Sequence, residues 1–384
     1  MMIGEDEKRY LTALASIPDV GPLTVKKLLA AFGSAQAVFG ADAKKLAAAG
    51  IGPRRVEAIS KFSDWRGFDL MLERAGKAGI RVVALGEDDY PRMLALIPDC
   101  PPVLYVKGQT GEEDRFALGI VGTRTPTAYG VSQAEGLAAG LAKKGFTIVS
   151  GLARGIDTAA HEGALKAGGR SIAVMGSGLD VPYPPENAGL IHRLAASGAV
   201  ISEFPPGTAP NKENFPRRNR LISALSLGIL VVEAGKGSGS LITARCALEQ
   251  GKEVFAIPGN ISSAFSRGTN ELIKQGARVV TGVDDMIEEL APVLKGLLFL
   301  NDGGEEQGKA SPQPKPEASQ PAVPFEQLSE EEKLVVGALG TGPKHIDEIA
   351  RDIGFDAPRI MGVLLSLELS GVVRQSAGKK FSIC

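Results

Sequence analysis

The sequence predicts an α/β protein whose central region forms a parallel, doubly wound sheet. Three observations support this fold class. Between residues 76 and 292, buried-strand runs alternate with helical patterns, which is typical of strands joined by right-handed crossovers. Residues 1–75 have helical patterns and predict a small N-terminal module. A Pro-rich polar stretch at 293–324 predicts a disordered linker. Residues 325–384 predict a winged helix, with helices at 330–339, 346–353 and 357–370 and a C-terminal hairpin.

The N-terminal module is expected to contain helical segments at 8–15, 23–31 and 43–48. Two short turns, at 17–22 and 49–53, contain Gly and Pro and lead into basic helix starts. This pattern indicates a helix-hairpin-helix, in which a Gly turn lets backbone amides approach a phosphate. Asp19 lies in the first turn, where its negative charge opposes phosphate. We therefore favour a structural or protein-contact role for this module over a DNA-binding role.

The central region is expected to contain strands at 81–85, 103–106, 117–121, 146–149, 171–175, 199–201, 228–232, 253–257 and 277–280. Helices at 129–144 and 157–167 follow the third and fourth of these strands. Helices of this length between strands favour parallel pairing throughout. The patterns leave the spatial order of the strands open.

A strongly basic segment at 210–220, expected to form a loop, precedes the strand at 228–232. It sets Phe215 among three asparagines and contains a single acid, Glu213. Its cations are Lys212, Arg217, Arg218 and Arg220. Arg fits phosphate with a planar fork of donors, and an exposed Phe offers a base a stacking surface. The segment predicts a site for an anionic polymer, although most charge runs are only solvated loops.

Ligand sites in open α/β sheets lie beyond the carboxyl ends of the strands, so the Gly-rich segments that follow these strands are expected to converge. The segment after the 228–232 strand is rich in Gly and Ser and leads into a helix, where amides and the helix dipole favour phosphate. We expect one basic surface there, although the net charge of the chain is only -1. The predicted DNA-binding residues are Arg124, Arg154, Lys212, Asn214, Phe215, Arg217, Arg218, Asn219, Arg220, Ser238, Gly239 and Ser240.

Composition excludes several classes of protein. Three cysteines and three histidines occur without metal-ligand spacing, so we expect free thiols, no metal and no cofactor. No signal-peptide pattern opens the chain, and no apolar run approaches the roughly 18 residues of a membrane span. We expect a soluble cytoplasmic protein. In the winged helix, nine acidic residues against seven Lys and Arg favour a protein contact at least as much as DNA.

Catalytic interpretations remain open as alternatives. Gly176-x-Gly178 is a weak dinucleotide match, and no P-loop motif is present. Asp157 and His161 share a helix face near a strand end, but a structural role is favoured for both. A nucleotide-processing hydrolase with Glu233 as general base is the main rival to DNA binding. A winged-helix transcription regulator is a third hypothesis, and it predicts sequence-specific binding to duplex DNA.

The motifs together resemble the DNA-processing protein A family, also called DprA or Smf. The resemblance is carried by short motifs in order over about two hundred residues, at 119–124, 150–157, 176–184, 214–223, 233–243 and 256–259. It implies an extended Rossmann-like core that binds single-stranded DNA, a C-terminal winged helix and no known catalytic reaction. It further implies protection of incoming DNA in natural transformation, loading of the RecA recombinase and a homodimer.

The resemblance also implies a positively charged pocket for the DNA strand. Carried onto this chain, its contacts are Arg124, Lys212, Phe215, Arg218, Asn219 and Arg220. Arg154, Arg217 and the 238–240 amides are added from position and charge. In this mechanism, Arg and Lys hold phosphates while a base stacks on an exposed Phe215.

Overall fold

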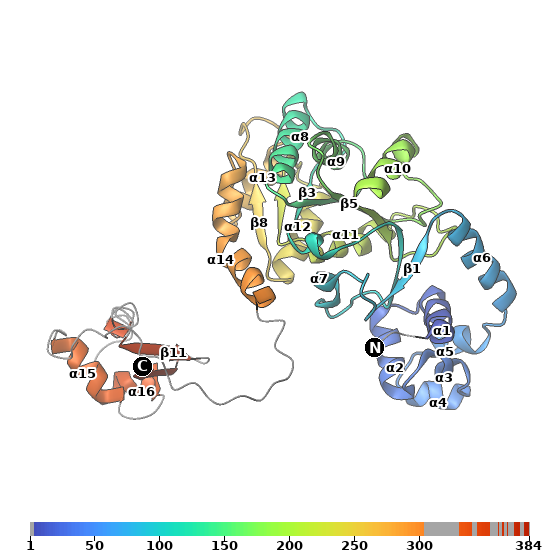
Figure 1. Ribbon diagram of the computed structural model, residues 1–384, viewed down its shortest axis with the longest axis horizontal. Helices are drawn as coiled ribbons and strands as arrows, with labels where there is room; N and C mark the ends of the chain where they lie inside the picture. Colours follow the sequence, from blue (N-terminus) through green and yellow to red (C-terminus); the bar gives the residue numbers. More distant parts are fainter. Residues whose placement is uncertain are drawn as a thin grey trace. The chain divides into compact units, whose positions relative to one another are not determined.

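The computed structural model divides the chain into two compact units, Met1–Gly304 and Glu305–Cys384. The structure describes residues 4–302, 330–339, 344–353, 360, 363–364, 367, 372–376 and 380–383. Each unit is described by itself below, with the element labels of Figure 1. No helix in these ranges is both long enough and apolar enough to cross a membrane.

The first unit opens with a helical module. Its helices are α1 (Glu5–Ser16), α2 (Pro22–Phe32), α3 (Ala35–Phe39), α4 (Ala43–Ala48), α5 (Pro53–Ser60) and α6 (Trp65–Lys77). Pro occupies the first turn of α2 and of α5, where its missing N–H costs no helical hydrogen bond. Leu14, Leu28 and Leu46 form a buried core that extends to Ala84 and Val103 of the sheet. The predicted helical module is confirmed, and it packs on one end of the sheet.

The central sheet has nine strands in the order β1-β2-β6-β5-β4-β3-β7-β8-β9. They are β1 (Arg81–Ala84), β2 (Val103–Gly108), β3 (Ala117–Val121), β4 (Thr147–Ser150), β5 (Ser171–Met175), β6 (Ala199–Ser202), β7 (Gly228–Val231), β8 (Glu253–Ala256) and β9 (Arg278–Val279). Each predicted strand is present. The pairs from β6 to β9 are parallel, as expected.

The expectation of parallel pairing is wrong for the first two strands. β1 pairs antiparallel with β2, and β2 pairs antiparallel with β6. Parallel pairing needs a crossover of a dozen or more residues that packs back on the sheet, usually a helix. Only the short helix α7 (Arg92–Ala95) separates β1 from β2, so the chain returns beside β1 in the opposite direction.

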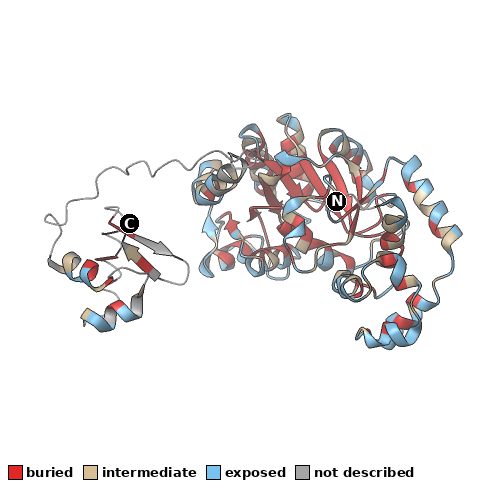
Figure 2. Cartoon of the chain, turned by 60° about the horizontal axis from the view of Figure 1, so that its bottom comes forward, coloured by how far each residue is buried: buried red, intermediate tan, exposed pale blue. Residues whose placement is uncertain are grey.

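Helices cover both faces of the sheet (Figure 1). They are α8 (Ala128–Lys143), α9 (Ile156–Lys166), α10 (Ala188–Ser197), α11 (Asn214–Ala224), α12 (Ser240–Glu249), α13 (Arg267–Lys274) and α14 (Val283–Asp302). Strand β3 shows the two-residue period, with Leu118 and Ile120 packed toward α8 and α9, and Val121 toward α11 and α12. Figure 2 shows the resulting buried strands between helices with exposed outer sides.

Two boundaries differ from those predicted. Helix α14 includes Pro292 and ends at Asp302, beyond residue 293 where the linker was expected to begin. Its apolar residues Leu290, Leu294 and Leu297 pack on the core formed by α8 and α9, which explains the longer helix. The rest of the predicted linker, 303–324, lies outside the described residues.

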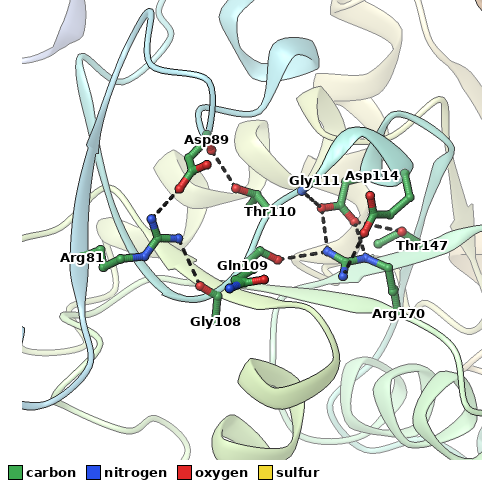
Figure 3. Close-up of polar contacts among 10 residues, drawn as sticks. Arg81, Asp89, Gly108, Gln109, Thr110, Gly111, Asp114, Thr147 and Arg170 are labelled. Atoms are coloured by element: carbon green, nitrogen blue, oxygen red, sulfur yellow. Dashed lines mark hydrogen bonds and ion pairs between the residues drawn. The ribbon is translucent and has the colours of Figure 1, made fainter. Parts of the chain in front are cut away.

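The amino ends of the central strands carry a network of paired charges (Figure 3). Arg170, just before β5, donates from Nε to Asp114 Oδ1 at 3.0 Å and from Nη2 to Asp114 Oδ2 at 2.9 Å. Thr147 Oγ1, at the start of β4, donates to the same carboxylate at 3.0 Å. Arg170 also donates to the carbonyl of Gln109 at 3.0 Å. The network fixes the segment between β2 and β3 on the edge of the sheet.

The second unit contains α15 (Glu330–Leu339), β10 (Lys344–His345), α16 (Ile346–Ile353), β11 (Val373–Ser376) and β12 (Lys380–Ile383). Its small sheet has the order β10-β12-β11, with antiparallel pairs. The core includes Val335, Leu339, Ile349, Leu364 and Phe381. The two predicted helices at 330–339 and 346–353 and the hairpin are present. Most of the third predicted helix, 357–370, lies outside the described residues.

Candidate nucleic-acid interface

The strand order reverses between β3 and β7. These strands pair in parallel, but β3 is followed by α8 on one face of the sheet and β7 by α12 on the other. A crevice forms beyond the carboxyl ends of the strands at such a switch point. A cavity of about 780 Å³ lies there. Its walls include residues 121–125 at the end of β3, residues from 235–243 after β7, and one face of α11.

The basic segment enters this cavity as part of a helix. We expected residues 210–220 to form a loop, but α11 begins at Asn214. Phe215, Arg218, Asn219 and Ile222 have the i, i+3, i+4, i+7 spacing that places side chains on one helix face, and all four line the cavity. The burial of this face against the sheet explains why so polar a segment becomes helical.

Phe215 provides an aromatic wall of the cavity. The side chain is half-buried, so it is less exposed than we expected, but it lines the cavity. Its ring centroid lies 5.7 Å from that of Tyr183 and 5.3 Å from the Arg124 guanidinium. A Cβ added to Gly176 would lie 2.9 Å from the Phe215 ring, so only Gly at this position leaves room for the ring. The arrangement combines a stacking surface with a cation.

Unpaired cations lie at or beside the cavity. Arg124 and Lys212 line the cavity and are exposed. Lys236 lies between two lining glycines, and its side chain is exposed as well. Within residues 4–302, none of these three side chains has a salt-bridge partner; all ion pairs of that range lie elsewhere. Their charge is therefore available to an anionic ligand.

Arg218 lies at the floor of the cavity, with 4% of its surface exposed. Its Nη1 donates to the carbonyls of Gly151 and Val174, and its Nε donates to Asn219 Oδ1 at 3.3 Å. Burial lowers the pKa of Arg218 to about 10, and the nearby Asp157 opposes that shift. The guanidinium is thus charged at neutral pH. It ties α11 to the ends of β4 and β5, and adds positive potential to the floor.

The buried polar residues near this floor form no hydrolytic triad. Ser150 donates to the carbonyl of Ile120 at 2.6 Å, while His161 Nδ1 lies 2.7 Å from Ser171 Oγ. Burial lowers the pKa of His161 to about 3, so its ring is neutral. Burial raises the pKa of Asp157, and Arg218 opposes this. The structural interpretation of these residues therefore fits their contacts.

Glu233, the proposed base of the hydrolase hypothesis, is also engaged within the protein. It is 4% exposed and accepts hydrogen bonds from Thr127 N at 2.9 Å and Thr127 Oγ1 at 2.6 Å. Thr127 is the N-cap of α8 and accepts a bond from Gly130 N. The Glu233 carboxylate therefore holds the start of α8, and it is not part of the cavity lining.

Two of the predicted DNA contacts are ion-paired outside the cavity lining. The Arg220 guanidinium pairs with Glu203 Oε2 at 2.6 Å and with Asp99 Oδ2 at 3.2 Å, and its side chain is 14% exposed. Arg154 forms a bidentate pair with Glu186 through Nε and Nη2. The expectation that all predicted residues converge on one surface is therefore corrected, because these cations have carboxylate partners.

Two further predicted residues also lie outside the lining. The Asn214 amide is buried and donates to the carbonyl of Ala209 at 3.3 Å, which fixes the turn before α11. The Arg217 guanidinium is exposed and lies 5.0 Å from the ring centroid of Phe204. The remaining predicted residues do line the cavity: Arg124, Lys212, Phe215, Arg218, Asn219, Ser238, Gly239 and Ser240.

Sequence reasoning missed several residues of the cavity. Thr123 and Thr125 flank Arg124, and Thr243 lies in the first turn of α12. The positions of Thr123 and Thr125 beside a predicted site residue were a usable signal. Thr243 had no such signal, because its place on the cavity depends on where α12 begins. Within the described ranges, no cluster of three His, Cys, Asp or Glu side chains could hold a metal ion.

The fold and the cavity define a Rossmann-like binding protein with a basic, aromatic-lined pocket at the switch point. The model of the DNA recombination-mediator protein A family matches residues 81–291. A DprA winged helix domain matches residues 312–379, and a SAM-like helix-hairpin-helix tandem matches residues 11–62. The chain therefore belongs to the DNA recombination-mediator protein A family, a family of DNA-processing proteins, and the predicted resemblance is confirmed.

Curated relatives match most of the chain. Protein Smf of Synechocystis sp. is 33% identical and covers 99% of both chains. Protein Smf of Escherichia coli is 42% identical over 75% of this chain and 74% of its own length. The DNA processing protein DprA of Bacillus subtilis is 46% identical over 55% of this chain and 72% of its own length.

Two solved structures are similar to this chain in sequence and fold. DNA processing protein A from Streptococcus pneumoniae is 34% identical, with a TM-score of 0.64, over 75% of this chain and 99% of its own. DNA processing protein A from Helicobacter pylori is also 34% identical, with a TM-score of 0.50, over 56% of this chain and 97% of its own. The Helicobacter structure describes a single-stranded DNA binding mode of that protein.

Proposed function

We propose that the cavity at the switch point binds single-stranded DNA without sequence preference. The observation that carries this proposal is the half-buried Phe215 ring beside the unpaired cations Arg124 and Lys212 in one cavity. The single-stranded DNA binding of the Helicobacter pylori relative supports it. Backbone phosphates interact with the cations, and a base stacks on the ring.

Stacking explains both the affinity and the tolerance of sequence. A base stacked on an aromatic side chain contributes about 1 to 3 kcal/mol, whichever base it is. Duplex DNA binds less well in this mechanism, because its bases are already stacked on each other. The cavity also offers no protruding helix to enter a major groove.

We propose a binding role and no catalytic turnover. The hydrolase hypothesis needs a general base within reach of a bound nucleotide. Glu233, its candidate, accepts two hydrogen bonds from Thr127 instead. Asp157 lines the cavity, but the charge of the buried Arg218 acts on its carboxylate, which favours a structural role. These contacts support the binding hypothesis over hydrolysis.

Membership of the family supports a proposal for the cellular role. We propose that the protein acts in the cytoplasm, protects incoming single strands and helps to load the RecA recombinase during natural transformation or general recombination. We also propose that it works as a homodimer. The acidic winged helix and the N-terminal module are the proposed protein contacts.

The test is a titration with oligo-dT and a matched duplex. Phe215→Ala is expected to weaken oligo-dT binding by roughly 10-fold or more, because it removes one stacking contact. Phe265→Ala is the matched control: Phe265 is 37% exposed and lies outside the cavity lining, so its loss should change affinity less than about twofold. Equal effects of the two variants, or no preference of the wild type for single strands, would overturn the proposed function.

A further inference from the structure

The start of α12 forms one end of the cavity. Gly239 is its N-cap, and Ser238, Gly239 and Ser240 all line the cavity. The hydroxyl groups of Ser238 and Ser240 lie 2.7 Å apart. The N-terminus of a helix carries a partial positive charge and unpaired amides, so it favours an anion. The ten residues of α12 form nearly three turns, enough for a full helix dipole.

Thr243 gives an independent sign of a ligand at this helix start. The residue is 2% exposed and lines the cavity. Its hydroxyl has no hydrogen-bond partner within residues 4–302, although threonines such as Thr12 and Thr158 bond to backbone carbonyls there. The hydroxyl oxygen is accessible from the cavity. A ligand oxygen in the cavity would satisfy it.

The charges around the cavity favour phosphate as that ligand. Arg124 and Lys212 are unpaired among the described residues of the first unit, and Arg218 adds a buried positive charge. Asp157 also lines the cavity, and Arg218 beside it offsets the carboxylate charge. The volume of about 780 Å³ falls within the usual range of small-ligand sites. A nucleotide unit therefore matches the site in charge and size.

We propose that the cavity is a terminal site: it holds a nucleoside monophosphate unit, with its phosphate at the start of α12 and Thr243 and its base against Phe215. The inference rests on the proposed function and specifies which part of a strand enters. The floor is closed by Val121, Arg218, Asn219 and Thr243, each more than nine-tenths buried. An internal phosphate has chain on both sides, and both must leave through the mouth. A strand end has chain on one side only, so it enters the cavity more readily.

The charge of a terminal phosphate also favours a strand end over an internal nucleotide. A terminal phosphate carries a charge of about -1.5 to -2 at neutral pH and three free oxygens. A phosphodiester inside a strand carries a single charge and two free oxygens. The cations and the helix start therefore bind the terminal group more strongly. A 5′-phosphate and a 3′-phosphate would make the same contacts with the cations and the helix start. The experiment distinguishes between them.

The experiment is a competition assay with the full chain and an internally labelled oligo-dT. Competitors are dT oligomers of one length with a 5′-phosphate, a 3′-phosphate or hydroxyl ends, circular single-stranded DNA, dTMP and thymidine. We expect one phosphorylated oligomer to compete about 10-fold better than the hydroxyl form, which is the effect of about one charged hydrogen bond. We also expect dTMP to compete, and thymidine to compete much less.

Substitutions test whether the terminal phosphate binds at Thr243. Thr243→Val should bring the ratio between phosphorylated and hydroxyl oligomers close to one. Thr12→Val is the matched control, because Thr12 is a buried threonine in the N-terminal module that bonds to Lys8. It should leave the ratio at its wild-type value. Thermal unfolding of both variants verifies that they fold.

The outcomes distinguish the two proposals. Equal competition by hydroxyl, phosphorylated and circular DNA overturns the terminal site and leaves single-stranded DNA binding intact. A phosphate preference that survives Thr243→Val overturns the placement at α12. Failure of every DNA to bind overturns the proposed function, whereas competition between dTMP and labelled nucleotide would still support the terminal site.

Discussion

Cations at the two ends of the parallel strands have different surroundings. At the amino end, Arg81 is ion-paired with Asp89, and Arg170 is ion-paired with the buried Asp114 (Figure 3). At the carboxyl end, Arg124 and Lys212 line a cavity and have no ion pair within residues 4–302. A cation held by a carboxylate therefore stabilises the fold, whereas an unpaired cation at a cavity is available to a ligand.

The same rule divides the basic segment. Lys212 is exposed and unpaired among the described residues of the first unit, whereas Arg220 is held by Glu203 and Asp99. Burial raises the pKa of Glu203, and the charge of Arg220 opposes this shift. Arg220 thus links α11 to the segments after β6 and before β2. Residues that look equivalent in sequence therefore have separate roles in binding and in the fold.

Substitution of Arg170 tests the ion-paired amino end of the strands, and it should change stability more than any of the other substitutions. Arg170→Ala leaves the Asp114 carboxylate, whose side chain is 5% exposed, without its cation. Removing one partner of a buried pair costs roughly 3 kcal/mol, because the remaining charge stays buried. Urea unfolding should show this loss of stability, while the folded fraction keeps its affinity for oligo-dT. A loss of affinity in fully folded protein would contradict the division between the two ends.

Protonation of His161 tests whether a second buried cation is tolerated near Arg218. Burial, and then the charge of Arg218, lower the pKa of His161 to about 3. The unfolded value is near 6.5. Below pH 6.5 only the unfolded chain takes up the proton, so the contribution of the neutral ring to stability is present above that pH and is lost as the pH falls.

The expected loss between pH 7 and pH 5 is about 2 kcal/mol. It is measured as the difference in unfolding free energy between the wild type and His161→Asn at each pH, because the variant lacks the titrating group. Parallel pH dependences of the two proteins would show that the ring is protonated in the folded state without penalty. Such a result would weaken the rule that buried cations here require partners.

Sequence patterns predicted more of the fold than of the site. All nine strands were predicted because buried runs of Val, Ile and Leu recur between helical patterns. Their order was not, because it depends on contacts such as that between β3 and β7, which are far apart in the chain. Arg218 and Arg220 were indistinguishable for the same reason. Their partners Gly151 and Glu203 lie 67 and 17 residues away.

The double variant Arg124→Ala, Lys212→Ala tests the unpaired end. We expect roughly 10-fold weaker binding of oligo-dT at 0.1 M salt. The slope of log K against log salt should become about 1.4 shallower, since each phosphate contact on a single strand contributes about 0.7. Arg81→Ala, Arg193→Ala is the charge-matched control, because both arginines are half-exposed and ion-paired. A control slope that changes as much as the test slope would contradict the assignment.

Substitution of Arg154 should have the smallest effect on oligo-dT affinity. Arg154 lies next to the lining residue Ala153, but its guanidinium is ion-paired with Glu186. Arg154→Ala should change the affinity for oligo-dT less than about twofold, since exposed ion pairs contribute little. Glu186→Gln releases the guanidinium and should strengthen binding by about twofold at low salt, an effect that vanishes as salt screens the charge. If Glu186→Gln binds oligo-dT more strongly and the double variant Arg154→Ala, Glu186→Gln does not, the ion pair alone keeps the Arg154 guanidinium from the DNA. A 10-fold loss in Arg154→Ala would instead show that DNA displaces Glu186, and that paired cations also serve the ligand.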